Sequence, residues 1–193
     1  MTTMSLPSAY TAPGGPRPMR WTCAEFHRLG DLGVFEGRRA MLIDGVILEE
    51  GPMHPPHAIT LELVEEALRT AFGTGWRIRN QSPLVLGQDL DPEPDFAVIA
   101  GTARGNSGHP TMADLVVEVA DASLDFDTNQ KRLLYARAGI HEYWVVDING
   151  RRLLVYRTPQ AGDYANRQAL DPADTLSPLA APAAVVRVAD LLM

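Results

Sequence analysis

The 193-residue chain is 46% hydrophobic, which is enough to form one buried core. Its net charge of −7 argues against a nucleic-acid-binding protein with a positively charged surface all round. No run approaches the roughly 18 apolar residues of a membrane span, and the N-terminus lacks a basic region followed by an apolar run. We therefore expect a soluble, cytoplasmic protein. The single cysteine, Cys23, excludes an internal disulfide and a zinc site built from several cysteines.

The chain begins with a proline- and glycine-containing stretch, residues 1–19, which predicts a flexible arm. Residues 20–193 predict a single α/β domain with its core at about 20–158 and a C-terminal extension at 159–193. Thr22 and Glu25 match a capping box that begins a short helix ending near Leu29. Apolar runs at 41–43 and 46–48 flank Asp44-Gly45, a pair typical of a tight hairpin turn.

An amphipathic helix is predicted from His57 to Phe72, because apolar residues recur there at three- and four-residue steps. Gly73 and Gly75 end it. Extended runs follow at 76–80 and 84–86, and the apolar runs 96–100 and 115–120 predict buried strands of a sheet covered on both faces. The expected fold is thus an α/β fold, a mixed central sheet flanked by helices, with an N-terminal hairpin.

A second helix is predicted from Asp125 or Asp127, either of which could cap it, to about Ala138, with Gly139 just beyond its end. Residues 143–148 and 153–156 around Asn149-Gly150 predict a second tight hairpin. After residue 158 the pattern weakens, and a short strand is expected at 185–188.

Three ionisable residues lie in or near apolar strands, where burying a charge is energetically costly, and they are candidates for a catalytic site. Asp95 opens an apolar strand, Glu118 interrupts another, and Lys131 lies on the following helix. Two carboxylates on neighbouring apolar strands repel each other unless a cation lies between them, and hard oxygen ligands suit Mg²⁺. Taken singly, Asp95 could be a strand-entry turn and Lys131 a solvated ion-pair partner of Asp127.

Together these residues fit metal-dependent phosphodiester hydrolysis. Asp95 and Glu118 would hold Mg²⁺, which Mn²⁺ could replace, and the backbone carbonyl of Val119 could add a ligand. Lys131 would orient the attacking water or stabilise developing charge. Of the 17 basic residues Lys131 is the single lysine, and an ammonium is a compact donor that a guanidinium does not replace.

The sequence also resembles a bacterial "putative restriction endonuclease" family, catalogued as a domain of unknown function within the PD-(D/E)XK nuclease superfamily. The resemblance covers roughly residues 20–158 and rests on these motifs: 42–45 (LIDG), His57, Pro94-Asp95, 117–119 (VEV), Asp127 with Lys131, and 135–147 (YARAGIHEYWVVD). It implies a restriction-endonuclease-like fold with Asp95 and Glu118 as metal ligands and the lysine moved to the helix. His57, Gln81 and Asp127 are candidates for supporting those ligands, and the alternative for His57 is that it caps the predicted helix.

Two positions depart from the pattern. Ala120 stands where the superfamily motif places its lysine, and Met41 stands where the family usually carries a glutamate before the LIDG run.

The predicted function is a metal-dependent endonuclease acting on DNA, and a homodimer is expected because two copies can cut two strands. A nuclease fold that has lost catalysis and serves as a binding or assembly module, and an RNA- or structure-specific nuclease, are the alternatives.

Overall fold

The computed structural model describes residue 15 and residues 17–104 and 107–193, so residues 1–14 and 16 of the predicted arm lie outside the described residues. The chain divides into two compact units, residues 1–51 with 85–92 and residues 52–84 with 93–193. That residues 20–193 behave as one domain stays a prediction. Within the part described, no helix is long and apolar enough to cross a membrane.

The first unit contains the predicted capped helix and hairpin. Helix α1 (Cys23–Asp31) begins with both hydrogen bonds of a Thr22–Glu25 capping box. Strands β1 (Ala40–Ile43) and β2 (Val46–Glu49) pair antiparallel. The turn between them has φ of 48° at Asp44 and 74° at Gly45, so both central residues are left-handed, as a tight hairpin requires. The predicted N-terminal hairpin is confirmed.

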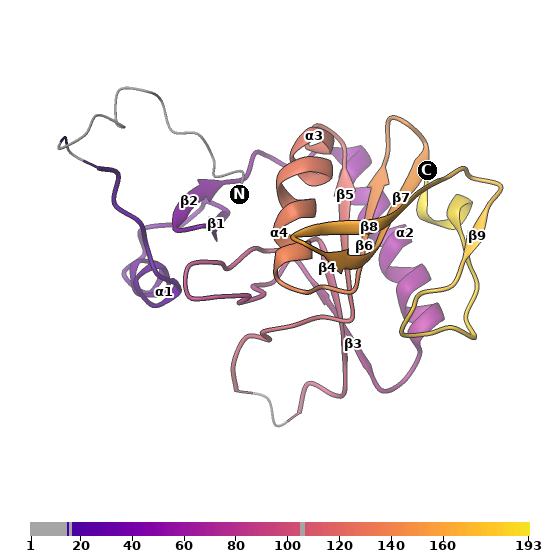
Figure 1. The fold of residues 1–193 in the computed structure, drawn as a ribbon, viewed down its shortest axis with the longest axis horizontal. Helices are drawn as coiled ribbons and strands as arrows, with labels where there is room; N and C mark the ends of the chain where they lie inside the picture. Colours follow the sequence, from indigo (N-terminus) through magenta and orange to yellow (C-terminus); the bar gives the residue numbers. More distant parts are fainter. Residues whose placement is uncertain (1–14, 16, 105–106) are drawn as a thin grey trace. The chain divides into compact units, whose positions relative to one another are not determined.

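The second unit is built on a mixed sheet (Figure 1). Among the described residues its strand order is β3-β4-β5-β6-β7-β8, in which β5 and β6 are parallel and the other neighbours are antiparallel. The strands are β3 (Trp76–Asn80), β4 (Phe96–Ala100), β5 (Leu115–Ala120), β6 (Glu142–Asp147), β7 (Arg152–Gln160) and β8 (Asp163–Leu170).

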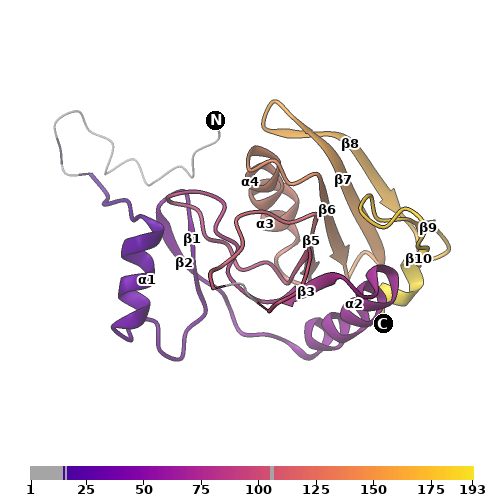
Figure 2. The same cartoon turned by 90° about the horizontal axis from the view of Figure 1, so that it is seen from below.

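Helix α2 (Pro55–Phe72) lies on one face of this sheet and the helical segment between β5 and β6 lies on the other (Figure 2). Leu115, Val117 and Val119 of β5 belong to the core cluster that includes α2 residues. Successive side chains of a strand point to opposite faces, so the intervening Glu118 faces the second helical segment. The predicted mixed sheet flanked by helices is confirmed.

The second helical segment has three parts: α3 (Leu124–Phe126), a π-helical turn η2 (Asp127–Lys131) and α4 (Arg132–Arg137). The prediction that Asp125 or Asp127 caps it was wrong, because the helix begins one turn earlier, after Ser123. Gly139 follows its end with φ of 78°, as predicted. π-Helical turns are rare and are frequent at functional sites.

The predicted hairpin of β6 and β7 is confirmed, because these strands pair antiparallel, but its predicted two-residue turn was wrong. The extended run at residues 84–86 lies in a loop, in which the Leu86 N–H donates to the Leu90 carbonyl. The β6–β7 connection is a four-residue loop closed by the pair Asp147 and Arg152, with its positive φ at Arg151. The Asp147 carboxylate accepts the Gly150 N–H, which favours this longer loop over a two-residue turn at Asn149-Gly150.

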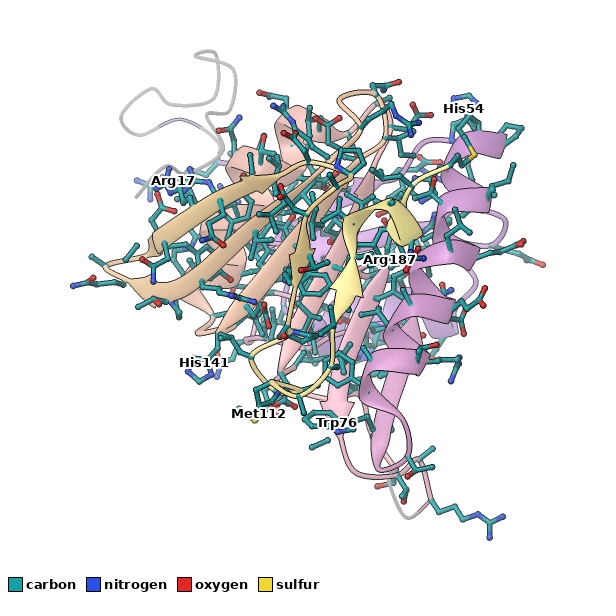
Figure 3. The ribbon with its side chains drawn as sticks, turned by 90° about the vertical axis from the view of Figure 1, so that its right-hand side faces the viewer. Arg17, His54, Trp76, Met112, His141 and Arg187 are labelled. Atoms are coloured by element: carbon teal, nitrogen blue, oxygen red, sulfur yellow. The ribbon has the colours of Figure 1, made fainter. Side chains whose placement is uncertain are left out.

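The C-terminal segment is more regular than the sequence pattern indicates. Strand β8 was not predicted, and short strands β9 (Thr175–Leu176) and β10 (Val186–Arg187) precede a 3₁₀ turn, η3 (Val188–Leu191). This segment lies beside α2 (Figure 3). Residues 186, 188, 191 and 192 are buried in the core cluster that includes α2, so this apolar terminal segment completes the core of its own subunit.

Candidate active site

Asp95 and Glu118 meet because β4 and β5 are adjacent and antiparallel. Phe96 pairs with Val117, which places the preceding Asp95 opposite Glu118. Two hydrogen bonds join these positions: the Asp95 N–H donates to Glu118 Oε2 at 3.4 Å, and the Val119 N–H donates to Asp95 Oδ2 at 2.8 Å. Both residues are buried: Asp95 is 7% exposed to solvent and Glu118 is 2% exposed. The two predicted acids therefore form one site.

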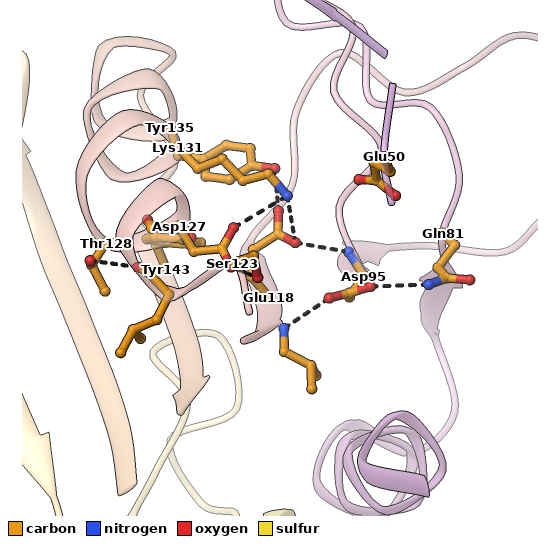
Figure 4. Close-up of polar contacts among 12 residues, drawn as sticks. Glu50, Gln81, Asp95, Glu118, Ser123, Asp127, Thr128, Lys131, Tyr135 and Tyr143 are labelled. Carbon is orange, nitrogen blue, oxygen red and sulfur yellow. Dashed lines mark hydrogen bonds and ion pairs between the residues drawn. The ribbon is translucent and has the colours of Figure 1, made fainter. Parts of the chain in front are cut away.

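Lys131 reaches this site from the helical segment (Figure 4). Its Nζ lies 2.9 Å from Glu118 Oε2 and 3.5 Å from Asp127 Oδ1, and the lysine is 5% exposed. Asp127 is held in turn by the Ser123 hydroxyl, which donates to its Oδ2 at 2.5 Å. Lys131 is thus a buried member of the cluster and not a solvated surface charge.

The remaining predicted residues contact Asp95. Gln81 donates from Nε2 to Asp95 Oδ1 at 3.1 Å, and His57 Nε2 lies 3.4 Å from the same oxygen. His57 stands in the first turns of α2, and Gln81 follows β3 with an unusual φ of 41°. The structure therefore brings together every side chain that the sequence singled out. Their catalytic and metal-binding roles stay predictions.

Tyr135 is a site residue that sequence reasoning missed. Its hydroxyl donates to Glu118 Oε1 at 2.8 Å, so each oxygen of that carboxylate has a separate partner. Tyr135 is fully buried and lies one helical turn after Lys131, as Lys131 lies one turn after Asp127. That four-residue spacing of three polar side chains was the signal that could have identified it.

Burial and neighbouring charges change the pKa values of the three acidic side chains. Burial raises the pKa of Glu118 to about 8, against the opposing charge of Lys131 and with reinforcement from Asp127 and Asp95. Burial also raises the pKa of Asp127. Burial acts to raise the pKa of Asp95 as well, but its hydrogen bond with His57 and the charge of Lys131 outweigh that effect and lower it.

Lys131 stays protonated near neutral pH. Burial would lower the pKa of its ammonium, but the carboxylates of Glu118, Asp127 and Asp95 outweigh burial and raise it. Three buried carboxylates therefore surround one lysine ammonium. A further cation would favour the ionised form of Glu118, whose proton burial otherwise retains up to about pH 8.

The donor set fits Mg²⁺ better than a metal that needs a closed protein cage. Within the described ranges, no group of three or more His, Cys, Asp or Glu side chains is arranged to hold a metal. Mg²⁺ is commonly bound by one or two carboxylates, with waters and substrate oxygens completing its shell. Asp95 and Glu118 supply two, and Oε2 of Glu118 would have to exchange some of its contact with Lys131 for the ion.

The chain matches the family model described as Uma2, putative restriction endonuclease, over residues 23–189. It belongs to this restriction endonuclease family. A search of curated proteins finds no match. Among solved structures, the chain is similar to a putative nuclease belonging to DUF820 from Anabaena variabilis ATCC 29413, with a TM-score of 0.73 and 18% identity. That match covers 90% of this chain and 97% of the other, and it shows that the two share a fold.

Family membership and the shared fold agree with the resemblance that the motifs indicated. The second unit has the restriction-endonuclease-like mixed sheet, and residues 23–189 include Asp95, Glu118 and Lys131. The chain is accordingly a nuclease-family protein.

Proposed function

We propose that this protein is a Mg²⁺-dependent endonuclease that hydrolyses phosphodiester bonds in DNA. The observation that carries the proposal is the convergence on Glu118 of the Lys131 ammonium at 2.9 Å and the Asp95 N–H at 3.4 Å, inside a buried strand pair. A buried charge cluster of this kind is costly for stability, and strongly perturbed groups gather where chemistry needs them. Membership of a restriction endonuclease family supports this interpretation.

Asp95 and Glu118 would hold the ion, with the Val119 carbonyl as a third oxygen, and Mn²⁺ would substitute for Mg²⁺. When bound, the ion supplies Lewis-acid polarisation of the phosphate and makes water more acidic. Gln81 and His57 fix the Asp95 carboxylate through Oδ1. Tyr135 fixes the Glu118 carboxylate through Oε1, which leaves the other oxygen directed at Lys131.

Lys131 would act as a cationic hydrogen-bond donor and not as a base. Because the surrounding carboxylates raise its pKa, the amine keeps its proton at neutral pH. A protonated amine can orient water through its own N–H groups and can stabilise negative charge that develops on the phosphate. Asp127 Oδ1 lies 3.5 Å from the same ammonium.

We further propose that the enzyme works in the cytoplasm as a homodimer, since two copies related by a two-fold axis can cut both strands of a duplex. A single-stranded, RNA or branched substrate would not need the second copy. Light scattering at working concentration tests the dimer, and a monomer that still cuts duplex DNA would contradict it.

One observation favours a second function. Met41 occupies the position at which the family usually carries a glutamate, and its thioether cannot serve as a hard ligand for Mg²⁺. A fold that has lost metal binding could act as a binding or assembly module. Ala120, in the usual lysine position of the superfamily, is compensated by Lys131 from the helix and so does not favour that alternative.

Metal binding separates the two functions. Titration calorimetry with Mg²⁺ and Mn²⁺ should show binding to the parent and its loss in Asp95→Ala. Glu62→Ala, an exposed acidic position on α2, is the matched control and should bind as the parent does. Equal binding by the parent and Asp95→Ala, or none by either, would support the module.

A further inference from the structure

Strand β3, at one edge of the sheet, carries two arginines at alternate positions. Arg77 pairs with Ile99 of β4 and Arg79 pairs with Ala97, while the residue that follows β3, Gln81, bonds to Asp95. Residues 77, 79 and 81 therefore follow one another along the edge strand at every second position. The last of them contacts the candidate active site.

These arginines face the same side of the sheet as the carboxylates. Trp76 and Ile78 of β3 pack against the α2 core, and Asn80 Nδ2 lies 3.4 Å from Glu65 of α2. Side chains alternate along a strand, so Arg77 and Arg79 point to the opposite face. Glu118 lies on that face too, because its neighbours Val117 and Val119 belong to the α2 core.

Among the residues that the structure describes, no acidic side chain neutralises either arginine. In the parts of the chain that the structure describes, Arg77 and Arg79 form no ion pair, whereas Arg69, Arg132, Arg152 and Arg157 each contact a carboxylate. Arg79 donates to the Pro83 carbonyl at 3.3 Å, and its Nε is buried with no hydrogen-bond partner among the described residues. A guanidinium without an acidic partner in a protein of net charge −7 is a cation that an anionic ligand can neutralise.

Arg77 is open to a ligand. It lines a pocket of about 380 Å³ together with Ser107, His109 and Thr111. Burial lowers the pKa of Arg79, and the charge of Arg77 lowers it further, which indicates that the two guanidinium groups repel each other. Phosphates between them would relieve that repulsion.

We propose that Arg77 and Arg79 form a binding track for the backbone phosphates of the nucleic acid on one side of the cleaved bond. Alternate residues of a strand are about 6.6 Å apart, a step comparable to that between successive phosphates of an extended nucleic acid strand. The track leads along β3 to Gln81 and Asp95, so it fixes the direction in which the backbone enters the site. This inference rests on the proposed nuclease function.

Salt-dependent binding tests the track without requiring cleavage. Fluorescence anisotropy of a fluorescein-labelled 20-base-pair duplex is measured in EDTA at several salt concentrations, for the parent and for Arg77→Gln/Arg79→Gln. Loss of two phosphate contacts should reduce the slope of log affinity against log salt by about 1.8, and weaken binding about 50-fold at 0.1 M salt. Arg77→Gln alone, at the more open position, should reduce the slope by about 0.9.

Two controls make the result specific. Arg77→Lys/Arg79→Lys keeps both charges and should keep most of the slope. Arg69→Gln removes an arginine on the α2 side that is already paired with Glu65, and should bind as the parent does. An unchanged slope in the glutamine variants, an equal loss in Arg69→Gln, or no binding by the parent would overturn the track. If binding behaves as proposed but no substrate is cut with Mg²⁺ or Mn²⁺, the nuclease function fails while the track stands.

Discussion

The ammonium of Lys131 lies 2.9 Å from Oε2 of Glu118, and both residues are at least nine-tenths buried. One belongs to a central strand and the other to the π-helical turn that covers it. In a site from which water is largely excluded, the Lys131 ammonium favours the ionised form of Glu118, against the burial that raises the pKa of that carboxyl. Their pairing connects the stability of the fold with the chemistry proposed for the site.

Removing the lysine charge should therefore destabilise the protein. Lys131→Met leaves Glu118, Asp127 and Asp95 without their ammonium, and breaking a buried pair costs about 3–5 kcal/mol. The free energy of unfolding in urea should fall by that amount. Arg187→Met, which breaks an exposed pair with Asp190, is the control and should cost about 1 kcal/mol or less. Similar losses in both variants would contradict the buried pair.

Replacing Lys131 with another cationic side chain should separate its role in catalysis from its role in folding. Lys131→Arg retains a cation but replaces the compact ammonium with a planar guanidinium. Cleavage should fall below about one hundredth of the parent rate, while Mg²⁺ binding by calorimetry is retained. A variant that cuts as fast as the parent would show that Lys131 only balances charge.

Tyr135 is expected to position Glu118. Tyr135→Phe removes a hydrogen bond to a buried carboxylate, which is worth about 1.5–3 kcal/mol, and frees Oε1. Tyr164→Phe removes a bond to the Ile140 carbonyl and should cost about 0.5–1.5 kcal/mol. The first variant alone should also weaken Mg²⁺ binding. Equal effects of the two variants on metal affinity would rule out a positioning role.

Stability should depend on pH through Glu118. Its folded pKa of about 8 lies above the ordinary value of 4.5, so the folded state binds this proton more tightly than the unfolded state does. The stabilisation is fully present below the ordinary pKa and is lost as pH rises toward about 8. In EDTA, the urea midpoint of the parent should fall over this range relative to Glu118→Gln, which cannot titrate. Parallel pH curves would contradict the shift.

Much of the fold was predictable because local signals agreed with the final structure. The Thr22–Glu25 capping box and the Asp44-Gly45 turn act within a few residues, and both are present. The Asn149-Gly150 turn failed because Asp147 supplies an alternative hydrogen bond that lengthens the loop. Strand β8 was missed because most of its side chains are exposed or half-buried, so its apolar alternation is weak.

The site residues that could be predicted are those whose charge contrasts with the sequence around them. Glu118 stands out within an apolar strand, and Lys131 is the single lysine of the chain. Tyr135 was missed because a tyrosine within an apolar helical face resembles a core residue, and only its four-residue spacing from Lys131 indicated that its hydroxyl faces Glu118. Ser123 was missed because its role comes from the π-helical turn that places Asp127, and a one-residue change of helical pitch leaves no pattern in the sequence.

Metal-dependent cleavage of DNA is tested most directly by an assay on single-stranded, duplex and branched DNA, and on matched RNA, with Mg²⁺, Mn²⁺ or EDTA. The parent should cut DNA with either ion and not in EDTA. Asp95→Ala and Glu118→Gln should be inactive although folded, and Glu62→Ala should be as active as the parent. Cleavage in EDTA, equal cleavage by Asp95→Ala and the parent, or no cleavage of any substrate would contradict it.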